Sequence, residues 1–282
     1  MTIRNPVEWV YDSFRPSNLG LSGLHRSRAE LNDPVPTIRR IELSDLRDAL
    51  RKGVSDFGAG RTDVLFISII YPLAGLLIAR LVLDNNLLPL VFPVISGFAL
   101  IGPFAAAGLY EMSRRRELGH DVSWADAFGV VQRPAFGAFV GLALLMTGLY
   151  LLWLAVAMGI YWMTMGFTAP TTMPAFLNEI LTTTNGLALI VIGCGVGLLF
   201  ALVAFAMSVV SFPLLLDRKV TLATAVSTSV KAVLANPVPM LAWGMIVAAG
   251  LVLGSLPLLL GLIVVMPVLG HATWHLYRKV LD

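Results

Sequence analysis

Long apolar stretches alternate with short polar and basic segments along most of the chain, and this pattern predicts membrane-crossing helices. A helix needs about 20 apolar residues to cross the hydrocarbon core of a bilayer. The apolar run over residues 237–277 is too long for one crossing, and the sequence GSLP at 254–257 predicts a tight turn within it. We therefore expect six spans, at about residues 64–83, 87–110, 134–163, 187–216, 238–254 and 257–277.

The basic residues indicate how these spans are oriented. All Lys and Arg residues except Arg80 lie before the first span, between spans two and three, between spans four and five, or after the sixth. Cytoplasmic loops of membrane proteins are enriched in Lys and Arg, so this distribution predicts that both termini are cytoplasmic. The same distribution explains the net charge of +3 without a nucleic-acid partner.

Composition agrees with a polytopic, all-α membrane protein. The 282 residues are 57% hydrophobic and only 13% charged, whereas a soluble domain usually carries about 25% charged residues. The single cysteine, Cys194, excludes an intrachain disulfide and a cysteine-rich metal site.

A weak internal repeat accompanies the predicted spans. Ser44, Ser123 and Thr221 each stand before apolar pairs at helical spacing, which predicts three capped, amphipathic helices at the cytoplasmic face. Each is followed by an outgoing and a returning span, so the chain reads as three parallel pseudo-repeats. The alternative is that caps and basic loops recur here only because any such protein needs them.

Residues 1–43 are predicted to be a polar, mobile cytoplasmic tail, and residues 44–282 the membrane domain.

Three stretches carry a more specific signal. The sequences FALIGPFAAAGLYEMSRRRELG at 98–119, SFPLLLDRKVTLATAVSTSVKAV at 211–233 and the segment 234–279 closely resemble the bacterial family of predicted integral membrane proteins called domain of unknown function 2189. The resemblance covers about residues 43–280. It implies a six-helix protein of the bacterial inner membrane with no established biochemical role.

Some members of that family carry a cytochrome c oxidase label. The catalytic subunit of such an oxidase needs six intramembrane histidines, and this chain has four histidines in total. The chain therefore cannot be that subunit and could at most accompany an oxidase.

Two histidines near the C-terminus, His271 and His275, lie four residues apart and so on one face of a helix. They are candidate ligands of a metal or haem, either together or one of them with Glu111. The alternative, which we favour, is a helix end at the lipid headgroups, since aromatic and basic residues surround them. These interface candidates are Trp274, Tyr277, Arg278 and Lys279.

Three consecutive arginines, Arg114, Arg115 and Arg116, follow the second predicted span and are candidates for binding anionic lipid. The alternative is that they only set the topology. Glu111 precedes them by one helical turn, so we expect it to pair with Arg114 or Arg115 rather than to act as an acid.

Methionines in the longest external loop offer the most specific metal hypothesis. Met163 and Met165 form a Met-x-Met pair, and thioethers are soft ligands that suit copper(I). Methionine is also common as adaptable packing in apolar helices. We favour packing and expect no cofactor.

An absence supplies the main functional indication. No Asp, Glu, Lys or Arg lies at the middle of a predicted span, and the sequence has no nucleophile–base pair or phosphate-binding loop. We therefore expect no enzymatic activity and no ion-coupled transport. The leading hypothesis is a scaffold that binds anionic lipids or another membrane protein. An oxidase accessory or assembly protein and a carrier of a neutral or lipid-like solute are the alternatives, and a homo-oligomer stays open.

Overall fold

The chain is all-helical wherever its structure, a computed structural model, describes it, apart from one isolated bridge between Ile38 and Leu281. The described residues are 36–59, 87–97, 106–120, 136–168 and 172–282, with 34, 69, 72–73, 75–77, 80, 122–123, 126–127, 129–130 and 170. Most of the first predicted span lies outside them. The helices are α2 (Leu43–Ala59), η3 (Leu88–Leu90), α6 (Ala107–Glu117), α7 (Phe136–Met165), α8 (Met173–Thr182), α9 (Thr184–Ser208), α10 (Ser211–Asp217), α11 (Leu222–Ala235), α12 (Pro237–Ser255) and α13 (Leu262–Val280).

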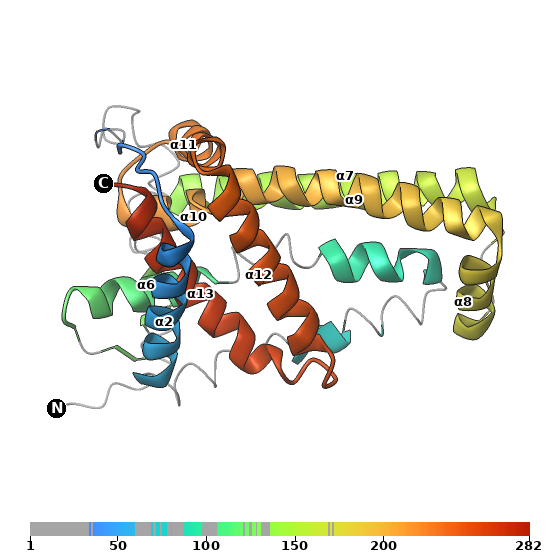
Figure 1. The fold of residues 1–282 in the computed structure, drawn as a ribbon, viewed down its shortest axis with the longest axis horizontal. Coiled ribbons are helices and arrows are strands. Elements are labelled where there is room, and N and C mark those ends of the chain that lie inside the picture. Colours follow the sequence, from blue (N-terminus) through green and yellow to red (C-terminus); the bar gives the residue numbers. More distant parts are fainter. Residues whose placement is uncertain are drawn as a thin grey trace.

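Helices α7, α8 and α9 form an arm that extends away from the rest of the molecule (Figure 1). Helices α7 and α9 run side by side, and α8 lies at their far end. Thr172 caps α8 by accepting a hydrogen bond from the amide of Ala175, and Thr183 caps α9 in the same way through Gly186. These caps satisfy amides that lack a partner inside the helix. Helix α8 is not among the predicted elements.

Three described segments are long and apolar enough to cross a membrane: Phe136–Met165, Thr184–Asp217 and Pro237–Ser255. They correspond to the third, fourth and fifth predicted spans. The fourth is interrupted at Val209 and Val210, where α9 gives way to α10.

The predicted turn in the last apolar run is present but longer than expected. Helix α12 ends at Ser255 and α13 begins at Leu262, so the last helix starts at residue 262 rather than 257. Pro257 cannot continue a helix because it lacks a backbone donor. Leu258 and Leu259 then adopt left-handed conformations, with φ of 52° and 67°. Such conformations are uncommon for residues other than glycine.

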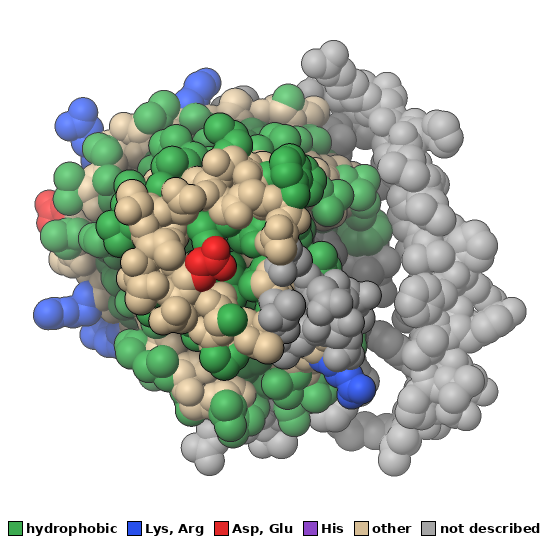
Figure 2. All heavy atoms as spheres, turned by 90° about the vertical axis from the view of Figure 1, so that its right-hand side faces the viewer, with side chains coloured by type: hydrophobic (Ala, Val, Ile, Leu, Met, Phe, Trp, Pro, Cys, Tyr) green, Lys and Arg blue, Asp and Glu red, His purple; other side chains and the backbone are tan. Residues whose placement is uncertain are grey.

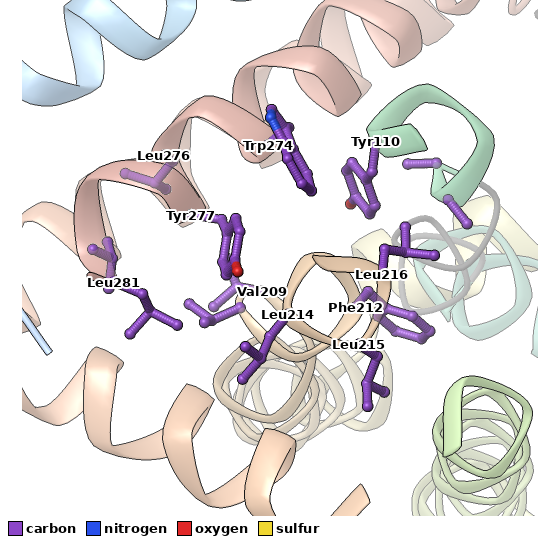
Figure 3. Close-up of a cluster of buried hydrophobic side chains, with 14 of the residues drawn as sticks. Tyr110, Val209, Phe212, Leu214, Leu215, Leu216, Trp274, Leu276, Tyr277 and Leu281 are labelled. Carbon is purple, nitrogen blue, oxygen red and sulfur yellow. The ribbon is translucent and has the colours of Figure 1, made fainter. Parts of the chain in front are cut away.

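The largest hydrophobic core lies at the base of the arm, in a region we call the head: α2, α6, α10, α11 and the C-terminal half of α13. Figure 3 shows Phe212 and Leu214 facing Trp274 and Tyr277 across this core. All four side chains are fully buried or nearly so. In Figure 1, α2 runs crosswise to α7 and α9, and α11 is seen end-on. The head therefore includes helices that lie across the direction of α7 and α9.

The segment before α2 is paired with the C-terminal end of the chain. The amide of Arg39 donates to the carbonyl of Val280 (2.8 Å), and the amide of Asp282 donates to the carbonyl of Thr37 (3.1 Å). The buried side chain of Asn236 joins the same segment by accepting from the amide of Ile41 (2.8 Å) and donating to the carbonyl of Arg39 (3.0 Å). Residues 37–41 thus close the head from outside.

The three predicted caps have different outcomes. Thr221 caps α11 by accepting from the amide of Thr224 (3.2 Å), as expected. Ser44 lies inside the first turn of α2 rather than at its cap, so that prediction is wrong. Asp45 instead accepts from the amide of Glu42 (2.9 Å), because a carboxylate in the first turn can reach back to the preceding amide. Ser123 donates to Asp126 through both its amide and its hydroxyl.

Candidate functional site

A cluster of polar and charged side chains joins α2, α6 and α13 in the head. Small residues bring these helices close together. A Cβ atom added at Gly53 of α2 would lie 2.7 Å from the Cβ of Ala272, and one added at Gly270 would lie 2.7 Å from Cδ1 of Leu109 on α6. Side chains on the three helices can therefore meet directly.

At the centre of the cluster, Asp56 binds groups from both neighbouring helices. Its Oδ2 atom accepts from the hydroxyl of Ser113 (2.7 Å) and lies 2.8 Å from Nε2 of His275. Its Oδ1 atom lies 3.1 Å from the guanidinium of Arg116. Burial alone would raise the pKa of the Asp56 carboxyl, but the hydrogen bonds with His275 and Ser113 outweigh it and hold that pKa below its usual value.

His271 completes the network from the buried side. Its Nδ1 atom lies 2.7 Å from the hydroxyl oxygen of Ser113, whose hydrogen is already donated to Asp56. Nδ1 must therefore carry the hydrogen, and Nε2 then holds a lone pair. Among the described residues, this buried Nε2 atom has no hydrogen-bond partner.

The contacts of this cluster hold α2, α6 and α13 together. Ser113 donates to a carboxylate rather than to an imidazole, and both Ser113 and His271 are buried. The two imidazoles, His271 and His275, bind different partners. Within the part of the chain that the structure describes, no group of three or more His, Cys, Asp or Glu residues could hold a metal ion.

The arginines that follow the second predicted span form a second part of the cluster. Glu111 is fully buried and pairs with Arg114 (Nε to Oε2, 3.0 Å) and Arg115 (Nε to Oε1, 2.8 Å), which confirms the expected local pairing. Arg115 also contacts Asp126, and the hydrogen bond with Glu111 is the largest of the effects that raise the pKa of its guanidinium. Binding to anionic lipid stays a prediction, since each of the three arginines already has a carboxylate partner.

The C-terminal residues of α13 are also bound within the head. Arg278 pairs with Glu117 (3.1 Å) and Asp217 (3.3 Å). Trp274 donates to Glu117 (3.1 Å) and Tyr277 donates to Asp217 (2.6 Å). Both aromatic rings are buried, so the structure places them beneath α6 and α10 rather than at an open helix end.

Lys279 attaches the same helix to the start of α2. Its ammonium lies 2.9 Å from Asp45 and 3.0 Å from Asp48. These two carboxylates are the largest of the influences that raise the pKa of Lys279. Hydrogen bonds from Lys279 and then from Arg51 lower the pKa of Asp48 to about 2.

We expect this contact to weaken in acid. Because the folded-state pKa of Asp48 is lowered from 3.8 to about 2, its stabilising effect is present above pH 3.8 and is lost as the pH falls towards 2. The protection of the α2 amides against hydrogen exchange, relative to the intrinsic exchange rate at each pH, should therefore fall between pH 4 and pH 2. The Lys279→Met variant should show a smaller loss of protection over this range, and an equal loss in the two proteins would contradict the assignment.

The structure does not bring the two candidate copper ligands together. Met163 is 88% exposed, whereas Met165 packs against a small cluster formed by Leu88, Tyr161 and Phe176. Residues two apart lie on different sides of a helix. Figure 2 looks onto this end of the arm, where hydrophobic and uncharged surface dominates.

The basic and histidine residues of the cluster were predicted from the sequence, whereas Asp56, Ser113 and Glu117 were not candidates. Asp217 was expected to pair with its neighbour Arg218, and the structure shows it bound to Arg278 and Tyr277. Their sequence signal is modest: Asp56, Glu117 and Asp217 are acidic residues in the last turns of α2, α6 and α10, and Ser113 lies in the middle of α6.

Comparison with known proteins adds one finding. Residues 91–217 match the family model described as a predicted integral membrane protein, DUF2189, and no curated protein or solved structure matches the chain. The match covers α6 with Glu111 and Ser113 and extends to the end of α10, whereas α2 and α13 lie outside it. The resemblance expected over about residues 43–280 is thus confirmed over its middle part. Residues 91–217 are thus similar to the DUF2189 family of predicted integral membrane proteins.

Proposed function

We propose that the protein is a non-enzymatic scaffold of the inner membrane, whose arm binds a transmembrane helix of a partner protein. The observation that carries the proposal is the exposure of α9. Only 6% of its most apolar 18-residue window is buried, compared with 22% for α7 and for α12. Helix α9 packs along α7, yet none of its residues from 187 to 203 is buried by the described part of the chain, so it has a face available for another helix.

The shape of that face supports a protein partner. Val191, Leu199 and Leu202 lie on one side of α9 and are exposed, with Gly195 between them. A Cβ atom added at Gly195 would meet no atom within 4 Å. Small residues of this kind let two helices approach closely in a membrane, where packing rather than hydrophobic burial drives association.

The sequence suggested that basic residues of the head bind anionic lipid or a partner, whereas we propose that they support the scaffold role by holding the head together. Its basic residues pair with carboxylates of the same chain, so they hold α2, α6 and α13 together. The arm between residues 136 and 216 contains Glu179 as its only charged residue. A charged head held together by ion pairs and an arm with a single charged residue suit a protein that is anchored at one side of the membrane and binds within it.

Photo-cross-linking in native membranes tests the proposal. A benzophenone amino acid at Val191 or Leu199 should give an adduct with one protein of defined mass, whereas the same group at Val252 of α12, also exposed, should give only lipid adducts. Gly195→Leu should reduce the protein adduct by at least tenfold because it fills the face. Lipid adducts alone at all three positions would contradict the proposal.

A further inference from the structure

A cavity of about 220 Å³ lies on another side of the arm. It is lined by the helical stretch 91–97, by α7 and by α9, and is open on one side. Its walls include Phe92, Gly97, Trp153, Cys194, Gly197 and Phe200. The cavity is therefore built from two of the described candidate spans and a third apolar helix.

Two glycines shape this cavity. A Cβ atom added at Gly197 would lie 3.0 Å from Cη2 of Trp153, and one added at Gly97 would lie 2.2 Å from Cε2 of Tyr150. The indole and phenol rings thus occupy the positions that side chains at 97 and 197 would need. Larger residues at these sites would push the rings into the cavity or force the helices apart.

The polar groups near the cavity are already bound within the protein. The indole N–H of Trp153 donates to the carbonyl of Pro93 (3.1 Å), and the hydroxyl of Ser96 donates to the same carbonyl (3.2 Å). No charged residue lines the cavity among the residues that the structure describes. A polar solute would lose its hydrogen bonds to water on entering and find few in return, so the lining selects an apolar ligand.

The mouth of the cavity opens at the apolar surface of the arm. Phe92 and Leu198 at the rim are each 59% exposed, and Cys194 beside them is also exposed. With α7 and α9 crossing a membrane, as the proposed function has them, hydrocarbon chains are the solvent around this surface. An apolar protein cavity of about 150 Å³ is large enough to take up benzene, so a cavity of this size holds several methylene groups.

We propose that this cavity binds the acyl chain of a membrane lipid. Residues 197 and 201 of the cavity lie on a different side of α9 from residues 195 and 199 of the proposed protein-binding face, and Leu198 at the rim borders that face. Substitutions at 197 and 195 therefore act on different sides of α9.

Fluorescence quenching by brominated lipid tests the proposal with the full-length protein. The protein is reconstituted into phosphatidylcholine vesicles with or without bromine atoms on the acyl chains. Trp153 is 3% exposed, so bulk lipid reaches little of its ring and a chain inside the cavity reaches more. The contribution of Trp153, taken as the difference between the wild type and Trp153→Phe, should fall by at least half in brominated vesicles.

Matched variants give the discriminating comparison. Gly197→Leu fills the cavity and should remove the quenching of Trp153, whereas Gly195→Leu projects into open space and should leave it unchanged. Ala201→Phe fills the cavity from another wall and provides a second test if Gly197→Leu does not fold. An unquenched Trp153 in the wild type, or quenching that persists in both filled variants, would overturn the proposal. If the cross-linker at Val191 and Leu199 gives no protein adduct while Trp153 is still quenched, the proposed partner helix is rejected and the lipid site is retained.

Discussion

Glu111→Gln should lower the free energy of unfolding by about 3 kcal/mol, the lower end of the range for breaking a buried ion pair. Glu111 is fully buried, and its loss of charge leaves Arg114 and Arg115 facing an uncharged amide. The two arginines are partly exposed, at 18% and 29%, so water compensates some of the loss. Unfolding by denaturant in detergent micelles measures the effect.

The matched control lies on the same helix. Glu117 is 38% exposed and pairs with Arg278, which is 41% exposed. The Glu117→Gln variant should therefore cost about 1 kcal/mol or less, as is usual for an ion pair that water reaches. The amide oxygen of the new glutamine can still accept from the indole of Trp274. Equal losses at the two positions would show that Glu111 is not the buried centre of the arginine pairs.

Gly53→Ala should detach α2 from α13 and lower the free energy of unfolding by about 1–3 kcal/mol, the usual cost of overpacking. The added methyl group would lie 2.7 Å from both the Cβ and the amide nitrogen of Ala272, and 2.8 Å from the carbonyl oxygen of Val268. Two of these three atoms belong to the backbone, so a change of rotamer cannot relieve the contact. Separation of the helices would also lengthen the contact between Asp56 and His275. Hydrogen exchange at the amides of α2 and chemical unfolding measure the loss.

Gly58→Ala is the control for the same substitution on the same helix. A Cβ atom at position 58 meets nothing within 4 Å. Alanine should therefore stabilise the helix by about 0.5–1 kcal/mol, because it loses less backbone entropy on folding than glycine does. The two variants should thus shift stability in opposite directions, and a shift of the same sign would contradict the packing of α2 against α13.

The sequence predicted those features that depend on neighbours along the chain. Apolar runs of sufficient length gave the positions of α7 and α12 to within a few residues. The pairing of Glu111 with Arg114 and Arg115 followed from their spacing of three and four residues on one helix. The break between α9 and α10 was not predicted, because neither Val209 nor Val210 is a residue that normally interrupts a helix.

The remainder of the cluster depends on contacts between distant parts of the chain. Asp56 and His275 are 219 positions apart, and Trp274 and Glu117 are 157 apart. Hydrophobic periodicity identifies the face of a helix but not the helix against which that face packs. For this reason we interpreted the sequence around the two histidines, Trp274 and Tyr277 as a helix end at the membrane surface. The structure instead buries Trp274 and Tyr277 under other helices.

The pairing of residues 37–41 with residues 280–282 has a consequence for biosynthesis. A ribosome makes the N-terminal side of this contact first, and more than two hundred residues, including α7, α9 and α12, are synthesised before Val280 emerges. Until then α13 cannot cover Gly53 of α2, and the carboxylate of Asp56 lacks its contact with His275. The head is consequently completed last, and a nascent chain stalled before residue 280 should remain open to chaperones and proteases at α2.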